Sequence, residues 1–394
     1  MKRLTAILGI AGLLASAIFF GTWLFRQQGQ GQLVWDRPTV KKTVQTFAYK
    51  VYGNSQLEHG RYFLSKMSLR NEGHKPVRDF SISYQVPGYI EWTTPEALPQ
   101  IPPGHTVIKC FYPQFPKKIT EIKNKTPAVL EIKIRWNDGN GPTHEDVVRE
   151  EFAFRGVNEF EYTDLPVNEI VFTSDAEVNH NLLAAMVTPN DPVVTEFAAA
   201  ITQVLGGAIA GAGGTKEAIE VMRGMYFYMV VTGMRYAGGL GLPEKIGDTI
   251  TTVQTIRLPR DVILSNNGLC IELTLLWASV LEHLGIHSYV MLVPGHAYIV
   301  VHSGKDLIPF ECTAITPKAV YEKKIVSFED ANQIAMKEFT EAKKSGDFTA
   351  VNPRALQAAG IQPPELPEIN IDQVKRIISD RTRLAMQFLR FSSK

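Results

Sequence analysis

The sequence is poor in cysteine and in net charge. Its three cysteines are too few for a disulfide framework, and their odd number leaves at least one free thiol. The 41 Lys and Arg residues almost balance the 40 Asp and Glu residues, so no basic excess indicates a nucleic-acid partner. No phosphate-binding loop of the Gly-x-x-x-x-Gly-Lys-Ser/Thr type is present, and we expect neither a cofactor nor a metal. With 45% hydrophobic and 21% charged residues, the 394-residue chain is predicted to be globular.

A single long apolar run stands near the start of the sequence. Leu4 to Phe25 carries no charge and lies between Lys2-Arg3 and Arg26. Because roughly 20 apolar residues span a bilayer, residues 1–26 are predicted to be a membrane anchor, with the body outside the cytoplasm. A cleaved signal peptide ending near Ala15-Ser16-Ala17 is the alternative. The apolar run continues past that point, which favours the uncleaved anchor.

The next part of the chain has the pattern of a β-sandwich. Residues 27–42 form a polar linker, and between residues 43 and 160 short alternating runs are separated by turn residues. The predicted strands are 47–52, 61–69, 80–86, 129–136 and 147–154. The stretches Asn71-Glu72-Gly73-x-x-Pro76-Val77 and Ile101-Pro102-Pro103-Gly104 resemble immunoglobulin-like modules of bacterial surface proteins.

From about residue 165 the pattern becomes helical, and residues 165–350 are predicted to form a second domain. The expected helices are 193–205, 215–232, 269–284, 327–344 and 372–391. A Pro-rich linker, 351–371, precedes a basic C-terminal helix in 372–394. We expect that helix to dock on the second domain; contact of its Lys and Arg residues with anionic lipid is the alternative.

Cys270, His296 and Glu311 are the candidate catalytic residues. Residues 269–284 are apolar almost all round, so this helix is predicted to be buried, with Gly285 ending it and Cys270 in its first turn. The free N–H groups and positive dipole end of a helix start favour a thiolate. A thiolate, an imidazole and a carboxylate are the groups of a cysteine nucleophile, its base and the residue that orients the base.

The spacing of His296 and Glu311 predicts a pair on neighbouring strands. Residues 288–293, 296–301 and 307–311 are expected to be antiparallel strands. A Ser303-Gly304 turn places His296 directly opposite Glu311, and a Gly304-Lys305 turn places them diagonally. Either register puts both side chains on one face of the sheet. A shift of the pairing by one residue would place Cys312, in place of Glu311, on the face of His296.

Residues 190–315 resemble the transglutaminase-like superfamily of papain-fold cysteine enzymes, in particular membrane-anchored bacterial members. The similar elements are Gly268-x-Cys270, Leu284-Gly285-Ile286, His296-Ala297-Tyr298 and Glu311-Cys312-Thr313, with Met234-Arg235-Tyr236 upstream. The resemblance implies an α+β fold in which a helix packs on an antiparallel sheet. It also implies that Cys270 is the nucleophile, His296 the base and Glu311 the orienting residue. The family usually has Asp in place of Glu311 and Trp in place of Tyr298.

The expected reaction is acyl transfer or hydrolysis at an amide or peptide bond. The substrate would be a protein or peptide, with cell-wall peptides included. The backbone N–H of Cys270 is the expected oxyanion donor, and Asn266 or Asn267 is a candidate for the second. A second hypothesis is that the protein is an inactive binding or scaffold protein. A third is that the β-sandwich has the main role, as an adhesion or partner-docking module. A zinc site of Cys270, His296 and Cys312 and a Cys270–Cys312 disulfide are further alternatives.

Overall fold

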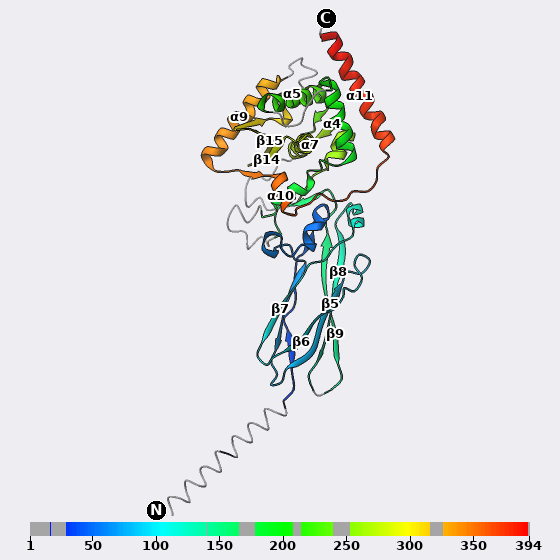
Figure 1. Cartoon of the computed structure of the whole chain (residues 1–394), viewed down its shortest axis with the longest axis vertical. Coiled ribbons are helices and arrows are strands. Elements are labelled where there is room, and N and C mark those ends of the chain that lie inside the picture. Colours follow the sequence, from blue (N-terminus) through cyan, green and yellow to red (C-terminus); the bar gives the residue numbers. More distant parts are fainter. Residues whose placement is uncertain are drawn as a thin grey trace, which may run out of the picture. The chain divides into compact units, whose positions relative to one another are not determined.

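The computed structural model describes residues 29–139, 141–164, 178–207, 214–238, 253–315 and 326–392, together with Ser16. The predicted membrane anchor in residues 1–26, apart from Ser16, lies outside the described residues. Within the described ranges, no helix is both long and apolar enough to cross a membrane. The protein has an α+β fold and divides into two compact units (Figure 1). The first contains the described residues up to Val44, Gly60–Pro116 and Pro127–Ala153.

The first unit is built from two β-sheets. One contains β1 (Leu33–Trp35), β2 (Thr39–Val40), β4 (Ser65–Asn71) and β7 (Thr106–Phe111). The other has the order β3 (Thr43–Val44), β9 (His144–Phe154), β8 (Thr126–Asn137), β5 (Val77–Gln85) and β6 (Glu96–Ile101). Side chains alternate between buried and more exposed along β4, as a half-buried strand requires. The rings of Trp35 and Trp136, one from each sheet, pack edge to face with centroids 5.6 Å apart.

One predicted strand of this region is wrong. Residues 47–52 form the 3-10 helix η1 (Thr46–Gly53), in which nearly every residue is buried. The alternation of apolar residues there does not reflect two faces of a strand, because Phe47, Ala48 and Val51 are all fully buried. The segment 45–59 belongs to the second compact unit, together with 117–126 and the chain from Phe154 onward. The strands β1, β2, β3, β6 and β7 were missing from the prediction, and β1 and β2 lie within residues 27–42, which were predicted to be a linker.

The second unit contains most of the helices. They are α3 (Leu183–Met186), α4 (Pro192–Val204), α5 (Thr215–Val231), α6 (Pro259–Ser265), α7 (Cys270–His283), α9 (Phe328–Ser345), α10 (Pro353–Ala359) and α11 (Ile371–Ser392). Its main sheet has the order β16 (Asp306–Phe310), β15 (His296–Ser303), β14 (His287–Val293) and β17 (Thr349–Val351), with antiparallel neighbours. Short strands β10 (Glu159–Glu161) and β12 (Val253–Thr255) pair with each other, as do β11 (Arg235–Tyr236) and β13 (Asn267–Gly268).

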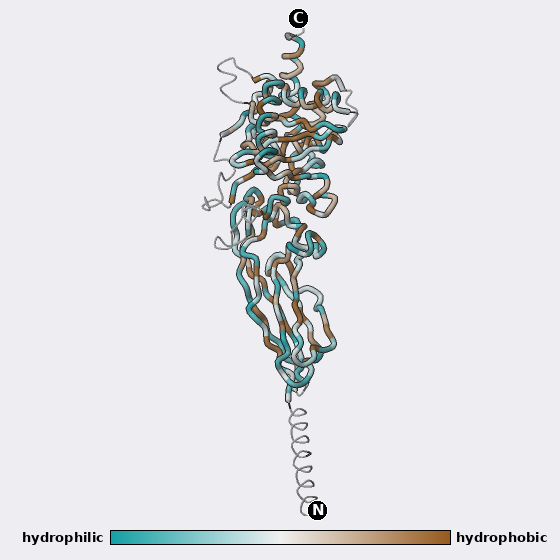
Figure 2. The backbone as a smooth tube through the Cα atoms, turned by 90° about the vertical axis from the view of Figure 1, so that its left-hand side faces the viewer, coloured by the Kyte–Doolittle hydropathy of each residue, from teal (hydrophilic) through white to brown (hydrophobic). Residues whose placement is uncertain are grey.

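Helix α7 is the centre of the second unit. It packs against β14 and β15 on one side and against α4 and α6 on the other, and its residues from Cys270 to Leu281 are all buried. In Figure 2 the hydrophobic segments of this unit gather toward its middle. Gly285, with φ of 79°, supplies the left-handed residue that ends the helix, as predicted. Helix α9 covers the opposite face of the sheet, where Tyr298 and Val300 pack near Ala335.

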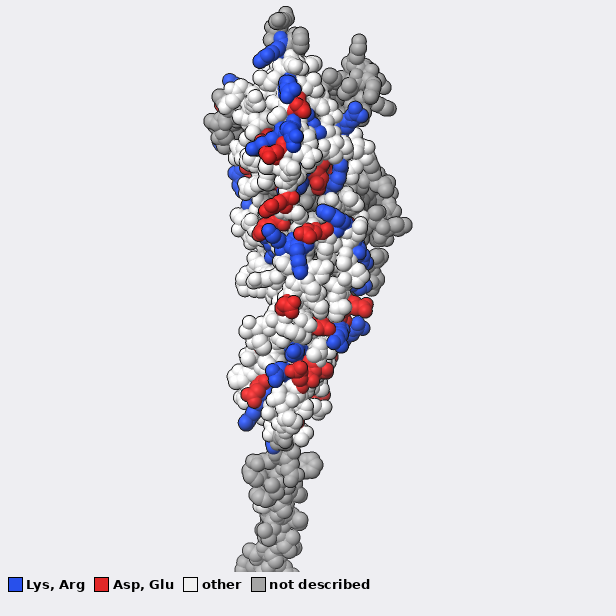
Figure 3. Space-filling model, turned by 90° about the vertical axis from the view of Figure 1, so that its right-hand side faces the viewer, with Lys and Arg blue, Asp and Glu red and all other residues white. Residues whose placement is uncertain are grey.

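The C-terminal helix α11 docks on the second unit. It packs along α4 and α5, and the ring of Phe388 lies 5.9 Å from that of Phe227. The guanidinium of Arg381 donates to the carbonyl oxygens of Ile263 and Leu264 near the end of α6. The docking prediction is therefore confirmed. On the face shown in Figure 3, basic and acidic side chains are interspersed.

Candidate active site

Cys270 is the first residue of α7 and exposes 3% of its surface. The chain enters the helix through β13, which pairs in parallel with β11. Before β13, Asn266 takes a left-handed conformation with φ of 56° and ends α6. Gly268 is needed for close packing, because a Cβ there would lie 3.1 Å from side-chain atoms of Leu273 and Val262. This tight passage fixes Cys270 at the N-terminal end of a buried helix, as predicted.

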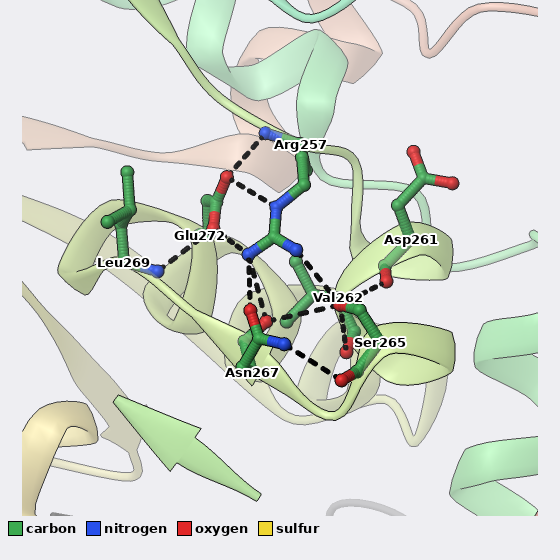
Figure 4. A network of polar contacts seen from close by, with 7 residues as sticks. All are labelled: Arg257, Asp261, Val262, Ser265, Asn267, Leu269 and Glu272. Carbon is green, nitrogen blue, oxygen red and sulfur yellow. Dashed lines mark hydrogen bonds and ion pairs between the residues drawn. The ribbon is translucent and has the colours of Figure 1, made fainter. Parts of the chain in front are cut away.

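An ion-pair network that was not predicted from the sequence holds the start of α7 (Figure 4). The Glu272 carboxylate accepts hydrogen bonds from the backbone N–H of Leu269 at 2.9 Å and from the Arg257 guanidinium at 2.7 and 3.0 Å. The same guanidinium donates to Asn267 and to the hydroxyl of Ser265. Glu272 thus satisfies a free N–H of the first turn and ties the helix start to the preceding loop.

His296 and Glu311 form a direct hydrogen bond. The distance between His296 Nε2 and Glu311 Oε2 is 2.7 Å. The turn between β15 and β16 consists of Gly304 and Lys305, since Ser303 pairs with Asp306. The register is therefore the diagonal one of the two predicted. The strand was predicted to include Glu311, but β16 ends at Phe310, so Glu311 lies one residue beyond the observed strand.

Glu311 is buried and its two oxygens have separate tasks. Oε2 contacts His296, whereas Oε1 accepts from the backbone N–H of Thr313 at 2.7 Å and from the Thr313 hydroxyl at 2.5 Å. Burial alone would raise the pKa of Glu311, but the hydrogen bond and charge of His296, followed by the Thr313 bonds, lower it below the usual range. The carboxylate is therefore charged at neutral pH and held in one orientation.

The pKa of His296 is raised to about 10. Burial acts to lower it, and hydrogen bonds to Cys270 and Glu311, with the negative charges of Glu311 and Glu338, outweigh that effect. The imidazole is therefore protonated at neutral pH. Because Nε2 contacts Glu311, Nδ1 is the ring nitrogen left for Cys270. The structure thus brings together all three residues that the sequence singled out.

Glu338, on α9, is a fourth member of the site that was not predicted. Its Oε2 lies 3.9 Å from His296 Nε2, and its side chain is 35% exposed. Burial and the negative charge of Glu311 raise the pKa of Glu338, while His296 lowers it. Tyr298, two residues after His296, is fully buried, and its pKa is raised by burial and by the charges of Glu338 and Glu311. No local sequence signal connects Glu338 to His296, because 42 residues separate them.

The alternative roles for Cys312 do not agree with the structure. Cys110, Cys270 and Cys312 are all free thiols, so the Cys270–Cys312 disulfide is wrong. Burial raises the pKa of Cys312 well above its ordinary value, which makes it a poor nucleophile or ligand. In the part of the chain that the structure describes, the side chains grouped closely enough to hold a metal are His296, Glu311 and Glu338. This set does not include Cys270 or Cys312.

Neither asparagine predicted as an oxyanion donor is supported. The Asn266 amide donates to the carbonyl oxygen of Thr232. The Asn267 amide donates to the carbonyl oxygen of Ser265, and its oxygen accepts from Arg257. Both side chains therefore stabilise the loop before α7.

No protein-family model matches this sequence, and no curated protein matches it either.

Proposed function

We propose that this protein is a thiol-dependent acyl-transfer enzyme in which Cys270, His296 and Glu311 form the catalytic triad. The observation that carries the proposal is the 2.7 Å bond between His296 Nε2 and Glu311 Oε2, on an imidazole whose pKa the nearby Cys270 thiol also raises. A carboxylate on one ring nitrogen and a thiol on the other are the arrangement that a cysteine nucleophile needs. The cysteine at a helix start adds the favourable dipole.

The charge state of His296 defines the proposed mechanism. The Cys270 thiolate attacks the carbonyl carbon of an amide, and the His296 imidazolium gives its Nδ1 proton to the leaving nitrogen as the C–N bond breaks. Water or an amine then loses a proton to His296 and attacks the thioester, and the C–S bond breaks to restore the thiolate. Throughout, Glu311 accepts the Nε2–H bond and stabilises the charged ring.

The wider proposal follows the sequence resemblance. The second unit would be a transglutaminase-like domain with a papain-like core, and the first an immunoglobulin-like β-sandwich. Residues 1–26 would anchor the protein in the cytoplasmic membrane with both units outside the cytoplasm. The substrate would be a protein or peptide, with cell-wall peptides as one class. The helix α7 packed on an antiparallel sheet supports the first part of this proposal.

A second candidate function is an inactive binding or scaffold protein at the cell surface. The observation that favours it is the burial of Cys270, of which 3% is exposed. A substrate carbonyl needs access to the sulfur atom. The two functions therefore differ in whether Cys270 reacts in the folded protein.

Thiol labelling of the full-length chain tests the proposal, with Cys110 as an internal reference because it is exposed. An ordinary thiol with a pKa of about 8.5 is roughly 0.3% ionised at pH 6. We expect iodoacetamide at pH 6 to alkylate Cys270 faster than Cys110, as measured by mass spectrometry of the labelled peptides. His296→Gln should remove this preference, and Cys110→Ala should leave it unchanged. If Cys270 stays unlabelled while Cys110 reacts, the enzyme proposal is wrong and the scaffold function is favoured.

A further inference from the structure

The imidazole of His296 and the carboxylates of Glu311 and Glu338 form a cluster of three potential metal ligands. The ligand atoms of His296, Glu311 and Glu338 all lie within 4.8 Å of one another. His296 Nε2 is 2.7 Å from Glu311 Oε2 and 3.9 Å from Glu338 Oε2. The three come from different elements, namely the start of β15, the residue after β16, and α9. One imidazole and two carboxylates are a donor set that zinc accepts.

The side chain of Tyr298 is a second observation that supports ligand binding at the cluster of His296, Glu311 and Glu338. Its side chain is fully buried, and its hydroxyl has no hydrogen-bond partner among the described residues. It lies on the same face of β15 as His296, with ring centroids 6.2 Å apart, and both Glu311 and Glu338 act on it electrostatically. A buried hydroxyl without a partner is costly, so a further polar group bound next to it would be favourable.

We propose that His296, Glu311 and Glu338 bind a divalent transition-metal ion, with Zn²⁺ as the best match, and that the bound metal switches the thiol site off. Zinc holds nitrogen and carboxylate ligands at about 2.0–2.2 Å, so two donors on a tetrahedral ion lie roughly 3.4 Å apart. The distances from His296 Nε2 to Glu311 Oε2 and Glu338 Oε2, 2.7 and 3.9 Å, lie on either side of this value, so small side-chain movements suffice. A water molecule on the metal gives the Tyr298 hydroxyl the partner that it lacks. Mg²⁺ and Ca²⁺ match less well, because both prefer oxygen ligands.

The metal and the proposed reaction compete for the same nitrogen. A metal on His296 Nε2 replaces the Nε2 proton, which leaves to solvent, and turns Glu311 from the orienting residue into a ligand. The ring then keeps a single proton on Nδ1, so it no longer supplies the imidazolium that the leaving nitrogen needs. Because the two carboxylates balance the charge of the metal, the positive charge that stabilises a Cys270 thiolate is lost as well. This regulatory step rests on the function proposed above, whereas the metal binding itself does not.

Calorimetric titration of the full-length chain with Zn²⁺ tests the metal site. We expect one site that persists in Cys270→Ala, because sulfur is not a ligand. Glu338→Gln should weaken binding by more than the roughly 10- to 100-fold that loss of an outer-shell partner costs. Glu341→Gln is the matched control, since it removes the same charge from an exposed position on α9 and should bind normally. Absence of binding, its loss in Cys270→Ala, or normal binding by Glu338→Gln would overturn the proposal.

A second measurement tests the switch. Saturating Zn²⁺ should slow alkylation of Cys270 at least about tenfold without affecting Cys110, and a chelator should restore the rate. Unchanged alkylation of Cys270 in the saturated protein would contradict the switch. If Cys270 does not react even without metal, the enzyme function fails, yet the titration of Cys270→Ala still decides the metal site. The two proposals can therefore fail separately.

Discussion

The substitution Glu311→Gln tests how the imidazole is held. Glu311 offers one oxygen to His296 and the other to Thr313. A glutamine has a single oxygen, so it satisfies one partner and presents an N–H₂ group to the other. Because Thr313 contributes two donors at 2.5 and 2.7 Å, we expect the oxygen to stay with Thr313. His296 Nε2–H would then face a donor and lose its acceptor.

The expected change in the pKa of His296 follows from this loss. A hydrogen bond to a charged group contributes about 1.5–3 kcal/mol, and one pKa unit corresponds to about 1.4 kcal/mol. The pKa of His296, about 10 in the native protein, should therefore fall by about 1–2 units in Glu311→Gln. Glu311→Asp keeps the charge but has a shorter reach, so its effect should be smaller.

Histidine-selective NMR of the full-length chain, with ring nitrogens followed across pH 5–11, measures this pKa. The other eight histidines are internal references. Glu341→Gln, which removes one exposed charge from α9, should leave the pKa of His296 nearly unchanged. A fall of less than about half a unit in Glu311→Gln would refute the reasoning, because the bond to Glu311 would then contribute little to the charge state of the ring.

Two further predictions concern stability. Glu272→Ala leaves the guanidinium of Arg257 without its carboxylate partner. Removal of one partner of a buried ion pair lowers the unfolding free energy by about 3–5 kcal/mol, and we expect the lower end because the Arg257 side chain is 28% exposed. Urea unfolding measures this loss of unfolding free energy, with Glu341→Ala as the exposed control. A decrease below about 1 kcal/mol in Glu272→Ala would contradict the stabilising role of the Arg257–Glu272 network. Because the folded pKa of His296, about 10, exceeds its unfolded value of 6.5, its contribution is complete below pH 6.5 and is lost as the pH rises toward 10. Unfolding free energy should fall across that window, less steeply in His296→Gln, and equal slopes in both proteins would exclude this coupling.

Much of the local structure could be predicted because each element carries its own signal. The apolar run 269–284 with Gly285 after it predicted α7 closely, and Ser303 to Lys305 restricted the turn to two choices. The segment 47–52 misled the prediction for a physical reason. A residue pattern indicates one face only when the other face is in water, and this segment is buried nearly all round.

The register of the strand pair that carries His296 and Glu311 could not be predicted from local sequence alone. Both predicted turns place His296 and Glu311 on one face, and the structure adopts the diagonal one. In that register Glu311 falls beyond the last ladder pair, at the start of the 3-10 helix η7 (Cys312–Ala314), where Thr313 can bind one of its oxygens. The longer side chain of glutamate therefore reaches His296 from outside the strand.

The sequence by itself determined that a thiol stands at a helix start and that an imidazole and a carboxylate share the face of a hairpin, because these relations depend on helix and strand periodicity. Only the tertiary structure decided what surrounds them. Arg257 and Glu272 meet across a loop, and Glu338 reaches His296 from a helix on the opposite face of the sheet to α7. Such contacts between distant segments depend on how whole helices and strands pack, so the spacing of residues in the sequence does not predict them.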